Sequence, residues 1–397
     1  MKKALVLLLV LALTFSVAAC GPTPSASAPA TAAPASAAPA TAAPESAAPA
    51  QKIKIGVSIW SSTDTLGSQC KTVLDEAAQA LGVDIQYVDQ GHVSEQVTAS
   101  VETLAAAGCQ GIIICNSSSA EMTSVINTCN QAKVYVAQFF RVIDKTANPN
   151  EYELACSSPY YVGCVHESEV DNGANLVRIL AEKGSRKIAI QGWQAGDATF
   201  LGRWEGYKKG AADWNAAHPN DQVTLLEPQY GGTTSDTGRA CAEALLNANP
   251  DMDALIVAGG GGDPLIGAIA AIEAKGLTGK VKVMSTDFLK DLDQQLAKGA
   301  IAGESGGHFT DPMFAFLMVY NAITGKYPKV ENGFYEIIYP YVYVASSQDY
   351  ADFAKYFVES PPYTPDEIRG LANMSFDELK AACAKLSIED VKARHGA

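Results

Sequence analysis

The sequence has few of the residue patterns that catalysis or metal binding usually requires. It contains only five histidines in 397 residues, and they are not clustered. It has no His-Glu-x-x-His motif and no Cys-x-x-Cys pair, which excludes the usual zinc-protease, zinc-ribbon and thioredoxin spacings. We therefore expect that the protein is not an enzyme and that it binds no metal ion and no cofactor. A cell-surface enzyme whose catalytic residues converge from distant positions is the less favoured alternative.

A run of basic residues is also missing. The formal net charge of the full chain is −14, and removal of Lys2 and Lys3 with the leader would make it about −16. An acidic chain without a basic patch does not neutralise phosphates, so we expect no nucleic-acid partner. It also cannot bind an anionic membrane through charge, so membrane attachment requires a lipid.

The longest apolar run is too short to cross a membrane. Lys2 and Lys3 precede ten apolar residues, 4–13, which predicts a cleaved export signal over residues 1–19. Two alanines followed by Cys20 and a glycine resemble a bacterial lipobox. We expect Cys20 to be lipidated, so that the protein is extracytoplasmic and anchored to the cell membrane by its N-terminus. An ordinary secretory signal with an incidental cysteine is the alternative.

Large apolar residues are absent from the segment that follows Cys20. Residues 21–51 are almost entirely Ala, Pro, Ser and Thr, which cannot form a core. The spacing of the prolines prevents a continuous helix: they stand at Pro29, Pro34, Pro39, Pro44 and Pro49. Residues 20–51 are therefore predicted to be a disordered tether, spanning roughly 30 Å as a coil and about 95 Å as a polyproline rod.

Eight further cysteines lie in the body of the chain. They are Cys70, Cys109, Cys115, Cys129, Cys156, Cys164, Cys241 and Cys383. An even number in an exported chain permits disulfides, and we predict one between Cys156 and Cys164. Buried free thiols, or a metal corner with His166, are the alternatives.

Two consecutive series of alternating strands and helices make up most of the body. In the first, strands are predicted at 52–59, 83–89, 111–115 and 134–140, and helices at 66–81, 93–107 and 120–131. In the second, helices are predicted at 171–183, 203–217, 237–247 and 264–275, and strands at 187–191, 223–226, 254–258 and 281–284. This pattern predicts an α/β protein with two doubly wound, Rossmann-like lobes. Ligands of such sheets bind beyond the carboxyl ends of the strands.

Five landmarks along the body resemble those of one known family. They are Gly-Val-Ser-Ile-Trp at 56–60, Gly-Ile-Ile-Ile-Cys-Asn-Ser at 111–117, Gln191-Gly192 with Arg203-x-x-Gly206-Tyr207, Asn-Pro-Asp-Met-Asp-Ala-Leu at 249–255, and Val-Met-Ser-Thr-Asp at 283–287. In this order and spacing, residues from 52 to about 343 resemble the type I periplasmic sugar-binding proteins, the ribose- and galactose-binding group. The tether stands where the lactose-repressor relatives carry a DNA-binding head, which excludes that branch.

The resemblance implies how the lobes are divided. Residues 52–165 and about 308–338 would form the N-terminal lobe. Residues 166–307 and about 339–397 would form the C-terminal lobe, including a helical C-terminal extension. A three-segment hinge would join the lobes, with crossings near 164–168, 286–289 and 305–309.

The resemblance also implies a function. The protein would be a monomeric solute-binding lipoprotein of an ABC importer. It would bind a small carbohydrate in the interlobe cleft by hinge closure and deliver it to a membrane permease. A receptor that presents a sugar or an autoinducer-2-like ligand to a sensor kinase or chemoreceptor is the alternative. The lack of a basic cluster favours a neutral carbohydrate over a sugar phosphate.

On the N-terminal lobe, the resemblance places ligand contacts after the first and fourth strands. Trp60 would stack on a sugar face, and Ser62 and Asp64 would meet hydroxyls. Trp60 could instead belong to the core, and Asp64 could cap the following helix. Arg141 matches the family's Asp-Arg pair, whereas Gln138 to Phe140 depart from it. Phe140 would add an aromatic surface or pack in the core.

Four further contacts are predicted on the C-terminal lobe, and a fifth, His308, near the third hinge segment. Arg203 would hold two adjacent oxygens, with a surface salt bridge as the alternative, and Trp193 would add a second aromatic face. Asp263 follows the glycines 259–262 and would lie where the backbone approaches the ligand, or cap a helix. Asp287 would accept from a hydroxyl. His308 would be a polar contact, or a structural residue.

Overall fold

The computed structural model describes residues 52–259 and 263–396 of the chain. The predicted signal peptide, the lipidated Cys20 and the tether lie outside the described residues. Over the described part, no helix is long and apolar enough to cross a membrane.

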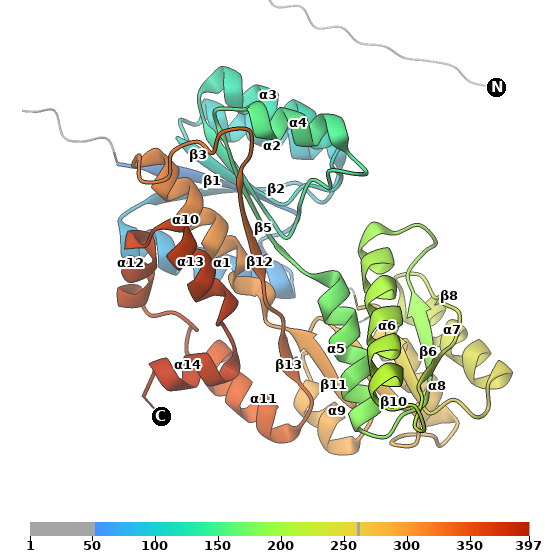
Figure 1. The fold of residues 1–397 in the computed structure, drawn as a ribbon. Coiled ribbons are helices and arrows are strands. Elements are labelled where there is room, and N and C mark those ends of the chain that lie inside the picture. The colour runs from blue at the N-terminus through green and yellow to red at the C-terminus, as the bar shows by residue number, and fades with distance from the viewer. Residues whose placement is uncertain (1–51, 260–262, 397) are drawn as a thin grey trace, which may run out of the picture. The chain divides into compact units, whose positions relative to one another are not determined.

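The N-terminal lobe is built on a six-stranded parallel sheet with helices on its faces (Figure 1). Its strand order is β12-β5-β4-β3-β1-β2. The strands are β1 (Lys54–Ile59), β2 (Asp84–Asp89), β3 (Gly111–Ile114), β4 (Tyr135–Phe139), β5 (Tyr161–Glu167) and β12 (Tyr335–Tyr339). The helices are α1 (Thr65–Leu81), α2 (Ser94–Ala106), α3 (Glu121–Ala132), α4 (Pro149–Ser157) and α10 (Asp311–Ile323). Every residue of β3 is buried, as expected for a parallel strand covered on both faces.

The C-terminal lobe is built on a second sheet with the order β13-β11-β10-β9-β6-β7, in which β8 also pairs with β6. The strands are β6 (Lys187–Gly192), β7 (Thr224–Leu225), β8 (Gln229–Tyr230), β9 (Ala254–Val257), β10 (Lys282–Thr286), β11 (Gly303–Gly306) and β13 (Val342–Val344). The helices are α5 (Glu169–Glu182), α6 (Ala198–Ala217), α7 (Ser235–Ala248), α8 (Asp263–Ala274) and α9 (Leu292–Lys298). The predicted fold class, two doubly wound α/β lobes, is confirmed.

The two sheets share one strand order and differ in their last strand: β12 runs parallel to β5, whereas β13 runs antiparallel to β11. Reading inward from one edge, β2-β1-β3-β4-β5-β12 corresponds strand by strand to β7-β6-β9-β10-β11-β13. Strand β4 of the first lobe therefore occupies the place of β10 in the second. This correspondence matters for the site, because the residues that follow β4 and β10 hold equivalent positions.

The chain passes between the two sheets three times, after β5, after β11 and after β12. The first two passages lie close to the crossings expected at 164–168 and 305–309. The crossing expected at 286–289 is wrong, because β11 pairs with β10 in the same sheet. The third crossing lies instead at residues 340–341, between β12 and β13.

The C-terminal extension contacts elements of both lobes. It comprises α11 (Ser347–Phe353), a π-helical turn (Ala354–Val358), α12 (Pro365–Asn373), α13 (Phe376–Ala384) and α14 (Ile388–Arg394). Helix α11 packs on α9 and β13, whereas α12 packs on α1 and α10 and α13 packs on β12. The prediction placed the whole extension with the C-terminal lobe. Buried apolar residues of α12 and α13, including Leu371 and Leu379, attach these helices to the N-terminal lobe instead.

The structure has no disulfide within the described residues. All eight cysteines from Cys70 to Cys383 are free, so the predicted pair Cys156–Cys164 is wrong. Cys164 is fully buried on β5, while Cys156 is partly exposed at the end of α4. Burial raises the pKa of the Cys164 thiol, so it behaves as a small apolar side chain.

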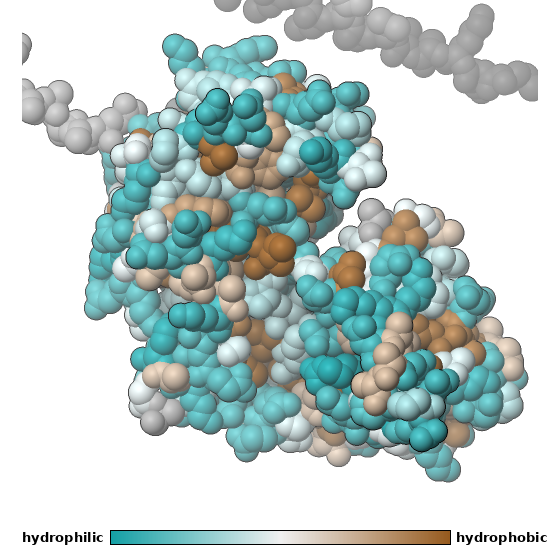
Figure 2. Space-filling model, in the orientation of Figure 1, coloured by the Kyte–Doolittle hydropathy of each residue, from teal (hydrophilic) through white to brown (hydrophobic). Residues whose placement is uncertain are grey.

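The face of the molecule drawn in Figure 2 is largely hydrophilic. Figure 2 shows one face, on which hydrophobic residues gather only in small, separate groups. This distribution is normal for a folded domain and does not indicate a large apolar docking surface.

Candidate functional site

A row of aromatic rings runs from the N-terminal lobe to the hinge segments. His92 and Trp60 stack with centroids 5.8 Å apart, and Trp60 lies 5.9 Å from Phe140. Phe140 meets His308 edge to face at 5.2 Å, and His308 meets Tyr341 at 5.2 Å. We call these five residues the aromatic row. Trp60 and Phe140 thus lie together.

Asp64 caps helix α1, which was the alternative reading of this residue. Its Oδ1 accepts from the backbone N–H of Gly67 at 2.7 Å, and its Oδ2 accepts from Trp60 Nε1 at 2.5 Å. The carboxylate therefore fixes the indole as well as the helix end. Ser62 donates to Asp89 at 3.0 Å on the exposed end of the same lobe.

Arg141 is held by backbone carbonyls of the N-terminal lobe. Its Nε donates to Asn116 O at 3.0 Å, and its Nη1 donates to Phe140 O at 2.8 Å. Gln138, near which a family carboxylate was expected, is fully buried. Its Nε2 donates to Asn116 Oδ1 at 2.6 Å, and its Oε1 accepts from Tyr161 at 2.5 Å. Gln138 therefore supports Asn116 from inside the lobe.

Phe140 and Asp287 hold equivalent places in the two lobes and share an unusual backbone. Each directly follows its strand, β4 or β10, and their φ angles are 56° and 75°. Left-handed backbone is uncommon outside glycine and is found at functional sites, particularly for a bulky residue such as Phe140. Both residues contact His308: the Phe140 ring at 5.2 Å, and the Asp287 carboxylate with 3.4 Å between Oδ1 and Nε2.

His308 joins these two strand ends. It begins the turn that follows β11 and is only 7% exposed. Burial lowers its pKa, so the imidazole is neutral near pH 7. Its Nδ1 is buried and has no hydrogen-bond partner among the described residues. A neutral ring that donates from Nε2 to Asp287 offers Nδ1 as an acceptor for a ligand hydroxyl.

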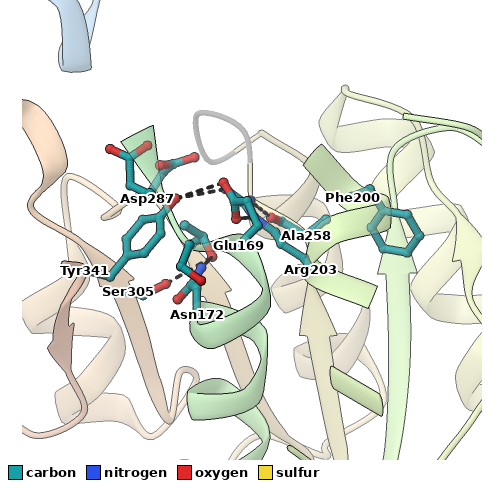
Figure 3. Close-up of polar contacts among 12 residues, drawn as sticks. Glu169, Asn172, Phe200, Arg203, Ala258, Asp287, Ser305 and Tyr341 are labelled. Carbon is teal, nitrogen blue, oxygen red and sulfur yellow. Dashed lines mark hydrogen bonds and ion pairs between the residues drawn. The ribbon is translucent and has the colours of Figure 1, made fainter. Parts of the chain in front are cut away.

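Arg203 lies in a polar network with Glu169 and Tyr341 (Figure 3). Its Nε donates to Glu169 Oε2 at 2.6 Å, and its Nη2 donates to Glu169 Oε1 at 3.2 Å. Tyr341 Oη accepts from Nη2 at 3.4 Å and donates to Glu169 Oε1 at 3.1 Å. Nη1 donates to the carbonyl of Ala258. The guanidinium was predicted to hold ligand oxygens or to form a surface salt bridge. The structure pairs it with Glu169, whose carboxylate is partly buried.

Glycines bring Glu169 and Arg203 together by letting α5 and α6 pack closely. A Cβ on Gly206 would lie 2.3 Å from Val170 O, and one on Gly173 would lie 2.4 Å from Arg203 O. Either contact is far shorter than packed atoms allow. The Arg-x-x-Gly-Tyr motif found in the sequence therefore serves the helix contact as well as the side chain of Arg203.

Trp193 covers Arg203 on a further side. Its ring centroid lies 5.4 Å from the guanidinium carbon, and its Nε1 donates to Gly259 O at 2.6 Å. Asp263 is exposed at the start of α8, and the described residues show no contact between it and the other predicted site residues. The glycines 260–262 that precede it lie outside the described residues.

A pair of carboxyl groups is buried behind Phe140. Glu167 ends β5 and Asp311 begins α10, and the two carboxyl groups act on each other electrostatically. Glu167 Oε1 and Asp311 Oδ2 are buried and have no hydrogen-bond partner among the described residues. Asp311 Oδ1 also accepts from the backbone N–H of Phe140 at 3.2 Å. Burial raises the pKa of Glu167 to about 8 and raises that of Asp311. The two groups therefore share a proton.

A Gly-x-Ser-x-Gly spacing in the chain does not present an exposed serine. Gly303-Glu304-Ser305-Gly306-Gly307 fits a Gly-x-Ser-x-Gly spacing, but Ser305 is fully buried in β11 and donates to Thr286 Oγ1 at 3.0 Å. It is no exposed nucleophile.

Cys164, His166 and Glu336 lie close together, and His166 Nε2 pairs with Glu336 at 2.9 Å.

Sequence reasoning missed Glu169, Tyr341 and His92. Glu169 follows the first hinge crossing directly, so its position next to the hinge could have marked it as a site residue. Tyr341 lies in the third crossing, which was placed elsewhere. His92 holds a left-handed backbone of φ 56° after β2, which no sequence pattern indicated.

Comparison with known proteins gives a consistent result. The family model described as "Periplasmic binding protein domain" matches residues 55–323. A D-ribose/D-allose-binding protein of Pseudomonas aeruginosa is 23% identical over 213 residues, which is 54% of this chain and 62% of that protein. The chain thus spans less than two thirds of that relative.

Solved structures match the fold more completely. An ABC transporter periplasmic solute-binding protein from Actinobacillus succinogenes with bound D-allose has a TM-score of 0.62 at 19% identity, covering 76% of this chain and 100% of that one. An ABC transporter solute-binding protein from Bacillus halodurans with bound myo-inositol has a TM-score of 0.59 at 20% identity, covering 77% and 98%. At these identities the likeness shows a shared fold.

Proposed function

Because the chain belongs to the periplasmic binding protein domain family, we propose that it is the solute-binding component of an ABC importer. It captures one small uncharged carbohydrate between its lobes and delivers it to the membrane permease. The family consists of non-enzymatic solute-binding proteins. The lipid on Cys20 holds the protein at the outer face of the membrane.

The observation that carries this proposal is the meeting of the two lobes at His308. The buried imidazole contacts Phe140 of one strand end and Asp287 of the equivalent strand end in the other lobe. A ligand that touches this point interacts with both lobes at once. Such two-sided contact is what makes a closed form more stable than an open one.

The chemistry of the site suits a sugar. Trp60 and Phe140 offer aromatic surfaces for the C–H face of a pyranose or furanose ring. The carboxylate of Asp287 and the unpartnered Nδ1 of His308 accept hydrogen bonds from hydroxyls. The relatives support the same class, since they are named for D-ribose and D-allose or hold D-allose and myo-inositol.

A thermal-shift screen tests this function. D-ribose, D-allose, D-galactose, L-arabinose and myo-inositol would each be added to the mature protein. A true ligand at about 100 times its Kd stabilises the folded state by about 2.7 kcal/mol, which raises the Tm measurably. The absence of any shift across pentoses, hexoses, disaccharides, nucleosides and furanose autoinducers would contradict the proposal.

A further inference from the structure

The guanidinium of Arg203 is occupied before any ligand arrives. It makes four hydrogen bonds to Glu169, Tyr341 and the carbonyl of Ala258. The Arg203 side chain is only 5% exposed, and that of Glu169 is 23% exposed. A guanidinium carries five N–H donors, so little of its bidentate capacity is left for a ligand carboxylate or phosphate.

Glu169 also compensates the charge of Arg203. Two of the four hydrogen bonds of Arg203 are made to the Glu169 carboxylate, so the two side chains form a bidentate ion pair. Tyr341 donates to the same carboxylate and so fixes its orientation (Figure 3). Glu169 is at the first turn of α5, where the helix N-terminus stabilises a negative charge.

Positive charge is not in excess around the buried ring of His308. Four charged groups act on the buried ring of His308: the guanidinium groups of Arg203 and Arg141 and the carboxylates of Glu169 and Asp287. The ring itself is neutral, because burial lowers its pKa. An anionic ligand would have to leave water without a net positive charge to receive it, which is costly in a buried site.

From this arrangement we propose that Glu169 sets the charge selectivity of the site. By neutralising Arg203 it restricts the ligand to uncharged sugars and excludes sugar acids and sugar phosphates. This inference rests on the proposed function and adds a specificity residue to it. Glu169 acts through Arg203 and is therefore a positioning residue for the ligand, one whose charge decides which ligands are accepted.

The variant Glu169→Gln tests the proposal. Glutamine keeps the size and the acceptor oxygen, so Arg203 retains a hydrogen bond while its charge is no longer compensated. Binding would be measured by calorimetry for uncharged sugars (D-ribose, D-galactose) and for their charged counterparts (D-ribonate, D-galacturonate, D-ribose 5-phosphate). We expect the preference of the wild-type protein for the uncharged member to fall by about tenfold or more in the variant.

Glu182→Gln is the matched control. Glu182 lies at the other end of α5, and its side chain is 51% exposed in an ion pair with Arg178. The substitution makes the same change in net charge on the same helix, and it should leave the selectivity unchanged. The double variant Glu169→Gln/Arg203→Gln removes both charges and should gain no preference for acids.

Each outcome separates the inference from the function on which it rests. Wild-type protein that binds the acids as tightly as the uncharged sugars overturns the inference, whatever the variants do. Uncharged-sugar binding with unchanged selectivity in Glu169→Gln overturns it too, yet leaves the sugar-binding function standing. If no sugar binds, the proposed function fails. Sulfate then serves as the probe, and it must stabilise Glu169→Gln more than the wild type or the control.

Discussion

At the scale of single residues, Asp287 and His308 supply the hydrogen-bonding capacity of the site. Asp287 sits in left-handed backbone, which aspartate and asparagine tolerate better than most residues. Its carboxylate lies 3.4 Å from His308 Nε2, so the carboxylate also sets which ring nitrogen faces the ligand.

Replacing Asp287 by asparagine should weaken sugar binding strongly without unfolding the protein. Asparagine keeps the backbone preference but loses the negative charge, so both the hydroxyl contact and the orientation of His308 weaken. We expect an affinity loss of about 100-fold, which corresponds to about 2.7 kcal/mol, measured by calorimetry. Asp293→Asn, on the exposed face of α9, is the control, and unchanged affinity in Asp287→Asn would show that the site is misplaced.

The carboxyl pair Glu167 and Asp311 should make stability depend on pH. Burial raises the pKa of Glu167 in the folded state to about 8, well above its usual value. Between the usual value and pH 8, the folded protein therefore holds a proton that the unfolded chain has lost. This contribution is complete at acid pH and is lost as the pH rises through 8.

Urea unfolding between about pH 5 and about pH 9 checks this expectation. The free energy of unfolding of the wild-type protein should fall across this range. In Glu167→Gln/Asp311→Asn, which replaces both buried carboxyl groups by amides, it should change much less. Equal pH profiles for the two proteins would contradict a shared proton at this position.

Single residues were only partly predictable from the sequence. The positions of Trp60, Phe140 and Asp287 follow from the strand ends, because a parallel sheet presents those residues at one edge. The partner of Arg203 did not follow, because Glu169 reaches it through a helix contact that sequence order does not reveal. The burial of Gln138 was not predicted for a related reason, since it depends on neighbours from β3 and β5.

At the scale of elements, the contact between α5 and α6 determines the geometry of the C-terminal side of the site. Gly202, Gly206 and Gly210 repeat at intervals of four on α6, and Cβ atoms there would meet Glu169, Val170 and Ala174 at 2.3–3.0 Å. The stripe allows the two helix backbones to approach, which places Glu169 against Arg203. The helices were predicted from their periodicity, whereas this close approach becomes visible only in three dimensions.

Gly206→Ala should therefore destabilise the protein and weaken ligand binding. The new Cβ would meet the backbone carbonyl of Val170, which cannot move as a side chain can, and such overpacking costs about 1–3 kcal/mol. Gly370→Ala in α12, where a Cβ meets no atom within 4 Å, is the matched control. It should stabilise by roughly 0.5–1 kcal/mol, and thermal melts of both variants give the comparison.

At the scale of the whole molecule, the lipid anchor remains a prediction that fractionation can check. Wild-type protein expressed in its native membrane context should sediment with membranes, and Cys20→Ser should appear in the soluble extracytoplasmic fraction. Cys241→Ser changes a cysteine of the body and should leave the protein with the membranes. Membrane association of Cys20→Ser would contradict lipidation at this residue.

The C-terminal extension has a mechanical consequence for a protein that works by hinge motion. Helix α11 is seated on α9 and β13, α12 and α13 are seated on α1, α10 and β12, and α14 contacts α11. Rotation of one lobe against the other must displace or bend the C-terminal extension, in addition to changing the backbone conformation of the three hinge segments. In the proposed hinge closure, this segment, which is held by both lobes, limits the angle through which the lobes can separate.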